Sequence, residues 1–239
     1  MQMEMTETEL NARRCLLLTF GTGADALFWW GTFADIDESA RNLGQTAEKY
    51  FSTANFSVLV YGCENWNADY SPWPAPGLKE GETFDGNGTD TLAWLCGAMQ
   101  EVRQGALRQR WDNTSGPQYS MGYSLAGLFS LWAFYESGRF DGFVCCSGSL
   151  WLEGFDAYAA SRKAPRRAIC YLSLGGKEEH SPNERMARVG DATRSQFARM
   201  QEDTQITACT LKWNSGGHFA DAAKRLCMGI EYIIDNGRK

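Results

Sequence analysis

Short apolar runs alternate with amphipathic segments along most of this chain. The apolar runs are rich in β-branched, aliphatic and aromatic residues, which is typical of buried strands. They are DALFWWGTF (25–33), FSVLVYGC (56–63), QYSMGY (118–123), FDGFVCCSGSL (140–150), RRAICYLSLGG (166–176) and ACTLKWN (208–214).

Between these runs, apolar residues recur at helical spacing. The predicted helices cover 38–51, a segment capped by Thr89 or Asp90, the wholly apolar run 125–136, 153–162, 185–201 and a last helix that carries Leu226, Ile230 and Ile233. Strands that alternate with helices predict an α/β fold of the α/β-hydrolase type, a mostly parallel sheet with helices on both faces. We expect one domain over residues 1–239, because α/β domains of this length occur undivided.

Composition narrows the classes of function. The net charge is −6 and the sequence contains no run of Lys and Arg, which argues against a nucleic-acid partner. No apolar stretch is long enough to span a bilayer, and the polar, acidic N-terminus does not read as a secretory signal, so we expect a cytoplasmic protein without a membrane partner. The eight cysteines lie mostly in apolar runs without metal-site spacing, which favours reduced, buried thiols and no bound metal.

The segment MGYSLAGL (121–128) places Ser124 where a strand pattern changes to a helix pattern. A serine on such a turn stands at the carboxyl edge of the sheet, where ligands of parallel sheets bind. The turn is tight, so the residues two before and two after the serine must be small; here they are Gly122 and Ala126. This is the logic of the nucleophile elbow G-x-S-x-G, with alanine in the last position. The alternative is that Ser124 only caps the helix after it.

A serine hydroxyl needs an adjacent base to act as a nucleophile, and the chain has two histidines. His218 follows the last predicted strand and precedes the last helix, which again places it at the carboxyl edge. His180 lies in the polar run KEEHSPNER and is read as a solvated loop residue. We therefore expect His218 to be the base, the alternative being a histidine that caps a helix or lies on the surface.

A catalytic imidazole also needs an acceptor that fixes its tautomer. In this fold the acid lies between the serine and the histidine along the chain. Glu178, three residues after Gly175 at the end of a predicted strand, is the preferred candidate, with Glu179 as its immediate rival. Asp191 and Asp156 are less well placed in the chain. For each of the four acidic residues, the alternative interpretation is a solvated carboxylate without a catalytic role.

The oxyanion hole of such an enzyme uses two backbone N–H groups. The residue after the nucleophile, Leu125, supplies one of them. The loop after the strand at 25–33 supplies the other, for which Thr32 is the first choice and Phe33 the second.

The long loop at 64–88 and the segment after CCSGSL contribute aromatic residues to the predicted pocket. Trp66, Tyr70, Trp73 and Trp151 are the candidates for substrate binding. The alternative for each is that its ring packs the loop onto the domain.

These motifs resemble the esterase D-like and enterochelin-esterase-like group of the α/β-hydrolase superfamily. The resemblance rests on GYSLAGLFSLWAFYESGRFDGFVCCSGSLW, LSLGGKEE and GGHF and covers about residues 25 to 235. It implies a serine ester hydrolase with Ser124 as nucleophile, His218 as base and Glu178 as acid. The chain departs from the pattern at Ala126 and in a shortened N-terminal part of the sheet.

The predicted function is cleavage of a small-molecule carboxylic ester through an acyl-enzyme, without metal or organic cofactor. Three alternative functions stay open. They are a peptidase or acyltransferase on the same triad, a non-catalytic binding protein on a hydrolase scaffold, and an enzyme with a cysteine nucleophile. No cysteine lies at a glycine-flanked strand–helix turn, which counts against the last of these. Homo-oligomerisation through surface helices stays open as well.

Overall fold

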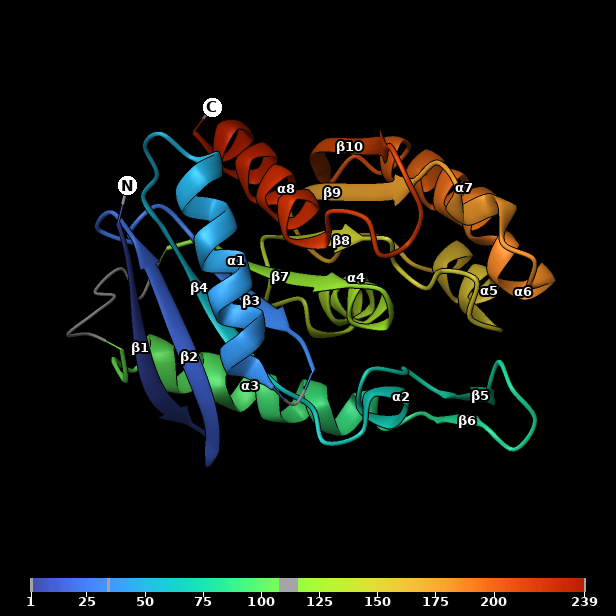
Figure 1. The fold of residues 1–239 in the computed structure, drawn as a ribbon, viewed down its shortest axis with the longest axis horizontal. Coiled ribbons are helices and arrows are strands. Elements are labelled where there is room, and N and C mark those ends of the chain that lie inside the picture. Colours follow the sequence, from blue (N-terminus) through green and yellow to red (C-terminus); the bar gives the residue numbers. More distant parts are fainter. Residues whose placement is uncertain (1, 34, 108–115, 239) are drawn as a thin grey trace.

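The computed structural model describes residues 2–33, 35–107 and 116–238, and within them a central sheet of eight strands (Figure 1). The order across the sheet is β1-β2-β4-β3-β7-β8-β9-β10. The strands are β1 (Met3–Leu10), β2 (Arg13–Phe20), β3 (Leu27–Gly31), β4 (Phe56–Tyr61), β7 (Gln118–Tyr123), β8 (Gly142–Cys146), β9 (Ala168–Gly175) and β10 (Ile206–Asn214).

Six of these strands, β4-β3-β7-β8-β9-β10, run parallel to one another, as the alternating pattern predicts. The other two were not predicted. β1 and β2 form an antiparallel hairpin, and β2 pairs antiparallel with β4 at the edge of the sheet. The residues of β1, MEMTETEL, are mostly exposed or half-buried, so an edge strand of this kind lacks the apolar run that identified the others.

Helices cover both faces of the sheet in the described part of the chain (Figure 1). They are α1 (Ile36–Tyr50), α2 (Trp66–Asp69), α3 (Gly88–Arg103), α4 (Leu125–Ser137), α5 (Phe155–Ala160), α6 (Glu184–Ala187), α7 (Val189–Gln201) and α8 (Ala222–Gly237). α3 begins at Gly88 after Asn87, so neither Thr89 nor Asp90 is its cap. None of the described helices is long and apolar enough to cross a membrane.

The period-2 geometry of the strands divides the core into two clusters, one on each face of the sheet. In β3, Trp29 packs with the cluster that includes α3 and α4, while Phe28 and Trp30 pack with the cluster under α1 and α8. α4 is buried on nearly every side, which explains why its sequence LAGLFSLWAF is apolar throughout.

The predicted long loop at 64–88 contains structure of its own. It holds the short helix α2 and a hairpin of β5 (Pro74–Pro76) and β6 (Thr83–Asp85). In Figure 1 this hairpin lies on the side toward which β7 and β9 point, which is also where α5 and α6 lie. The carboxyl edge of the sheet is therefore covered by the segments that follow the strands β4, β8 and β9 in the chain.

Candidate active site

Ser124 occupies the sharp turn between β7 and α4. Its backbone has φ 58° and ψ −126°, a left-handed conformation that a residue with a side chain adopts only at a cost. The helix that starts at Leu125 and the carbonyl of Cys146, which accepts from the Ser124 amide, hold this turn. The strained backbone lifts the hydroxyl above the carboxyl edge of the sheet.

Gly122 is required for this turn. A Cβ at Gly122 would lie 2.1 Å from the carbonyl oxygen of Ala126, so the close approach expected between these two positions is present. We expect Gly122→Ala to lower the free energy of unfolding by about 3 kcal/mol, because backbone must move to admit the methyl group. Urea unfolding measures the loss.

Gly176→Ala is the matched control for this substitution. A Cβ there meets its nearest atom, the carbonyl oxygen of Asn214, at an ordinary contact distance of 3.6 Å, so the expected change is within about 0.5 kcal/mol. Equal losses in the two variants would contradict the tight turn.

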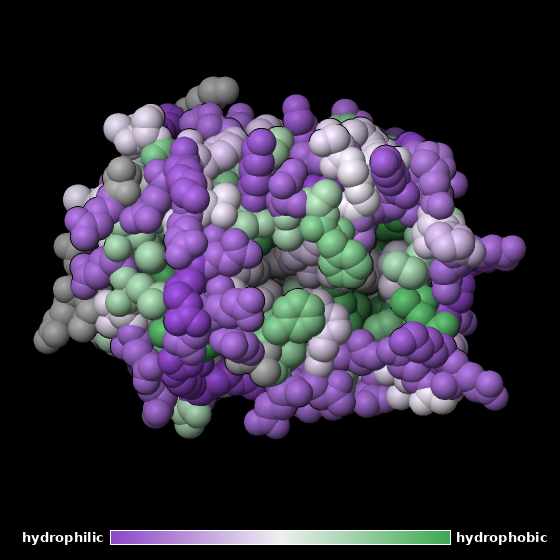
Figure 2. Space-filling model, in the orientation of Figure 1, coloured by the Kyte–Doolittle hydropathy of each residue, from purple (hydrophilic) through white to green (hydrophobic). Residues whose placement is uncertain are grey.

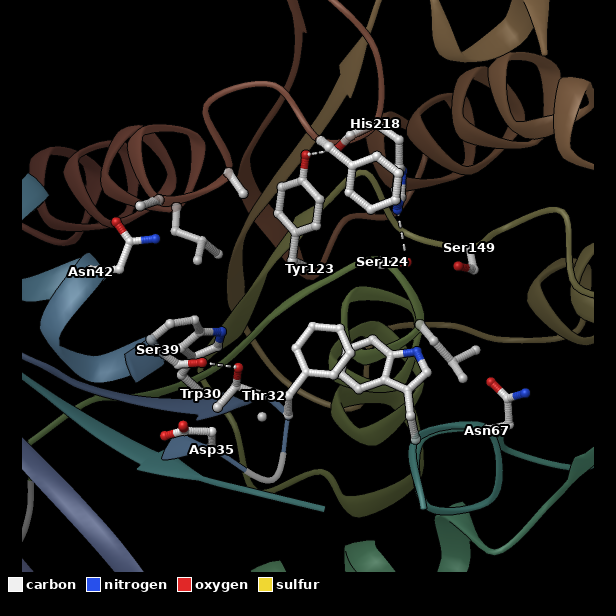
Figure 3. A pocket seen from close by; sticks show the side chains of 18 of the residues that line it. Trp30, Thr32, Asp35, Ser39, Asn42, Asn67, Tyr123, Ser124, Ser149 and His218 are labelled. Atoms are coloured by element: carbon white, nitrogen blue, oxygen red, sulfur yellow. Dashed lines mark hydrogen bonds between the residues drawn. The ribbon is translucent and has the colours of Figure 1, made fainter. Parts of the chain in front are cut away.

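Ser124, His218 and Glu178 form one hydrogen-bonded chain. His218 Nε2 lies 2.9 Å from Ser124 Oγ (Figure 3). On the other side of the ring, His218 Nδ1 lies 2.7 Å from Glu178 Oε2. The three side chains come from the turn after β7, the loop after β10 and the short 3₁₀ helix after β9. Parallel strands end at the same edge of a sheet, which is why residues 94 and 40 positions apart meet here.

The other sequence candidates lie elsewhere. His180 is exposed on the turn after Glu178. The carboxylate of Glu179 accepts from Arg194 at 2.6 Å, and Asp191 and Asp156 pair with Arg194 and Arg199. Among the four carboxylates considered, only Glu178 contacts the imidazole of His218.

The Glu178 carboxylate is buried, and both of its oxygens have hydrogen-bond partners. Its Oε1 accepts from the Ser147 hydroxyl at 2.6 Å and from the Gly175 amide at 2.7 Å, while Oε2 is left for His218. Burial alone raises the pKa of this carboxyl, but the hydrogen bonds from His218, Ser147 and Gly175 outweigh it and lower the pKa below the ordinary value. Glu178 is therefore held ionised, with one oxygen directed at the imidazole.

The sequence missed Ser147 as a site residue. It directly follows β8 at the carboxyl edge of the sheet, in the segment CCSGSL, and its backbone also has a positive φ of 46°. A polar residue at a strand's carboxyl end was the available signal.

The amides of the two predicted oxyanion donors differ in what they contact. Leu125 is the first residue of α4, and its amide has no protein acceptor among the described residues, which suits a donor at a helix N-terminus. The amide of Thr32, however, donates to the carbonyl of Tyr61 at 3.0 Å, because the β3–β4 ladder extends one residue past β3. The choice of Thr32 is therefore corrected: its N–H is already used. Phe33, the second choice, has an amide without a protein acceptor in the described part of the chain.

A cavity of about 680 Å³ opens over Ser124 and His218. Figure 2 shows a hollow on this face that is bordered by apolar residues and surrounded by hydrophilic ones. Two of the predicted aromatics, Trp66 and Trp151, line the cavity, and Trp66 stacks on the exposed ring of Phe33 with centroids 4.1 Å apart.

The other two predicted aromatics do not line the cavity. Tyr70 is 0% exposed, and its hydroxyl donates to the carbonyl of Thr32 at 3.0 Å, so it is a core residue that supports the turn after β3. Trp73 donates from Nε1 to the carbonyl of Glu153 at 2.7 Å and packs on Tyr158. Both rings follow the packing alternative: they hold the 64–88 segment onto the rest of the fold.

Much of the cavity wall comes from helices that the sequence pattern does not connect with the site. α1 contributes Ser39 and Asn42, and α8 contributes Ala222, Ala223 and Leu226. In Figure 3, Ser39 and Asn42 lie on one side of the Ser124–His218 pair, whereas Asn67 and Ser149 lie on the other. The cavity therefore extends in two directions from the hydroxyl, which leaves room for a group on each side of a bond placed there.

No protein-family model and no curated protein matches this sequence. Solved structures match its fold across nearly the whole chain. Siderophore hydrolase EstA from Aspergillus nidulans aligns with a TM-score of 0.69 and 15% identity, covering 98% of this chain and 95% of that one. An IroE-like serine hydrolase from Shewanella oneidensis gives a TM-score of 0.75 at 12% identity, covering 98% and 80% of the two chains.

The chain has the α/β-hydrolase fold. The enterobactin esterase FES from Shigella flexneri also matches, with a TM-score of 0.62 at 15% identity over 98% of this chain and 59% of that one. The predicted fold class is thereby confirmed. Within this fold the chain order of the three joined side chains, serine then glutamate then histidine, follows the order of an α/β-hydrolase triad.

Proposed function

We propose that this protein is a serine hydrolase that cleaves carboxylic esters through an acyl-enzyme on Ser124. The observation that carries the proposal is the chain from Ser124 Oγ to His218 Nε2 and from His218 Nδ1 to Glu178, at the floor of an open cavity. The structural neighbours named as siderophore hydrolase and enterobactin esterase support ester cleavage.

The proposed reaction has two halves. His218 Nε2 accepts the Ser124 proton while Oγ attacks the ester carbonyl, and Glu178 stabilises the imidazolium that forms. The Leu125 and Phe33 amides donate to the developing oxyanion, each contributing about 3 kcal/mol of transition-state stabilisation. His218 then protonates the leaving alcohol, and water attacks the acyl-enzyme with His218 again as base.

Hydrolysis of p-nitrophenyl esters beside peptide p-nitroanilides tests the reaction class. Ester turnover that is lost with His218→Ala supports the proposal. Anilide turnover at an equal or higher kcat/KM would assign the triad to a peptidase, and the absence of turnover on both would favour a binding protein.

The thiols are poorly suited to replace Ser124. None of the eight cysteines lines the cavity among the described residues. Burial raises the pKa of the Cys63 thiol to about 11 and that of Cys146 to about 12, which suppresses the thiolate that a cysteine nucleophile requires.

The cavity lining disfavours a negatively charged substrate. Its described lining includes the acidic residues Asp35, Glu38 and Glu82 and no Lys or Arg. Glu82 is held by Asn67 and by two backbone amides, and these hydrogen bonds lower the pKa of its carboxyl. A negatively charged ester would enter against this potential.

We therefore expect p-nitrophenyl pentanoate to have a kcat/KM at least about tenfold above that of mono-p-nitrophenyl glutarate, in which a carboxylate replaces the terminal methyl group. The ratio should narrow as salt is raised, because ions screen the repulsion. Steady-state kinetics at two ionic strengths measure both effects. A higher kcat/KM for the glutarate ester would contradict the inferred charge preference.

A further inference from the structure

A charged side chain lies on the apolar face of α8. Arg225 is 1% exposed and is followed directly by the buried Leu226 and Cys227. Taking a guanidinium out of water is costly unless it is paired and hydrogen-bonded, so a buried arginine at this position calls for a specific set of partners.

One nitrogen of Arg225 binds the acid side of the site. Nη1 donates to Ser147 Oγ at 2.8 Å, to Tyr123 OH at 3.1 Å and to Glu178 Oε1 at 3.2 Å. Ser147 in turn donates to the same Glu178 oxygen. Arg225 therefore holds the carboxylate through the oxygen that His218 does not use.

The other nitrogen binds the loop that carries the base. Nη2 donates to the carbonyls of Gly217 at 3.0 Å and Ser215 at 3.3 Å, on the residues that immediately precede His218. Tyr123, which accepts from Arg225, donates its own hydroxyl to the carbonyl of His218. Three carbonyls of one loop are thus held by Arg225 and by the tyrosine that it contacts.

Apart from these bonds, the loop is held by backbone amides, such as that of Lys177, which donates to the carbonyl of Gly216 at 3.0 Å, and by little side-chain packing. Gly216 has a φ of 87°, and a Cβ built on Gly217 would meet no atom within 4 Å. Phe219 is 93% exposed. A glycine-containing segment with little side-chain packing tends to move, so its order depends on its hydrogen bonds.

We propose that Arg225 is a positioning residue that sets the distance between Glu178 and His218 by binding the acid with one nitrogen and the histidine loop with the other. The inference rests on the proposed function for its kinetic consequences but not for the geometry itself. A planar guanidinium reaches both sides at once, whereas the single ammonium of lysine cannot.

The kinetic test uses Arg225→Lys, which keeps the buried charge, together with Arg225→Met. The matched control is Lys224→Met, which removes a cation from the exposed neighbouring position on the same helix. We expect Arg225→Lys to lower kcat for a p-nitrophenyl ester about 10²-fold, because displacement of a catalytic group by about 1 Å costs that much. KM should change less than kcat, and Lys224→Met should match the parent protein.

A second readout does not depend on turnover. The chain has two histidines, so the imidazole NMR signals of His218 are identified by comparison with His180→Ala and His218→Ala variants. We expect a slowly exchanging His218 Nδ1–H signal, due to its hydrogen bond to Glu178, in the parent protein and in Lys224→Met. In Arg225→Lys this signal should exchange rapidly or disappear.

The two readouts separate the two proposals. If the parent protein turns over no ester, the proposed function fails, but the NMR comparison still decides the role of Arg225. Should Arg225→Met not fold, Arg225→Lys carries the test. A kcat within about twofold of the parent in Arg225→Lys, with the His218 signal unchanged, would overturn the positioning role.

Discussion

Ser124→Ala is expected to lower kcat for a p-nitrophenyl ester about 10⁴- to 10⁶-fold, the loss seen when the nucleophile of a serine hydrolase is removed. The variant deletes the hydroxyl that lies within hydrogen-bonding reach of His218 Nε2, so no acyl-enzyme can form on this residue. The fold should persist, since the substitution removes a single atom and leaves the Ser124 backbone bonds to Cys146 and Ser149 in place. Single-turnover and steady-state assays measure the loss.

Ser149→Ala is the control for Ser124→Ala. Ser149 lines the same cavity, and its amide donates to the carbonyl of Ser124, but its hydroxyl does not contact His218. Its kcat should fall by at most about tenfold, because no bond to the reacting proton is lost. A Ser124→Ala protein that keeps full turnover would remove Ser124 from the mechanism.

Glu178→Gln is expected to lower kcat about 10³- to 10⁴-fold. The amide of glutamine can place an N–H opposite His218 Nδ1, which selects the tautomer with its proton on Nε2. That nitrogen then cannot accept the proton of Ser124. The geometry of the site should change little, because the two side chains have the same shape.

The control at the next position is Glu179→Gln. Its carboxylate pairs with Arg194 on the half-exposed surface of the turn rather than with His218, so kcat should stay within about twofold. Comparable losses in the two variants would contradict the assignment of the acid to Glu178.

The same pair of variants has different consequences for stability in acid. The pKa of Glu178 is lowered by folding, so its ionised form stabilises the protein above the ordinary glutamate value of 4.5, and this stabilisation is lost as the pH falls through the lower pKa of the folded state. The free energy of unfolding should therefore fall more steeply below about pH 4.5 in the parent protein and in Glu179→Gln than in Glu178→Gln. Denaturant unfolding at several pH values checks the slopes.

The three side chains that the structure joins by hydrogen bonds could be selected from the sequence because their positions follow from topology. Ser124, Glu178 and His218 each come directly after an apolar run, and the ends of parallel strands meet at one edge. The choice of Leu125 as a candidate oxyanion donor followed from its place directly after the serine. These inferences needed the order of strands and turns, but no knowledge of side-chain packing.

The residues that were predicted wrongly depend on details that the sequence pattern does not carry. Thr32 rather than Phe33 was chosen because the pattern cannot show that the β3–β4 ladder takes the Thr32 amide. Tyr70 and Trp73 lie in the expected loop, but tertiary packing decides which aromatic rings of this loop line the cavity. Arg225 did leave a signal, since a charged residue on the apolar face of a predicted helix calls for a buried partner.

Labelling with a fluorophosphonate probe, followed by peptide mapping, tests the central claim most directly, because the probe reacts with a serine only when a neighbouring base activates it. We expect a single adduct on the peptide that contains Ser124 in the parent protein. His218→Ala should abolish this adduct, whereas Lys224→Met should leave it unchanged. An adduct on another residue, or a Ser124 adduct that forms equally fast without His218, would contradict the account.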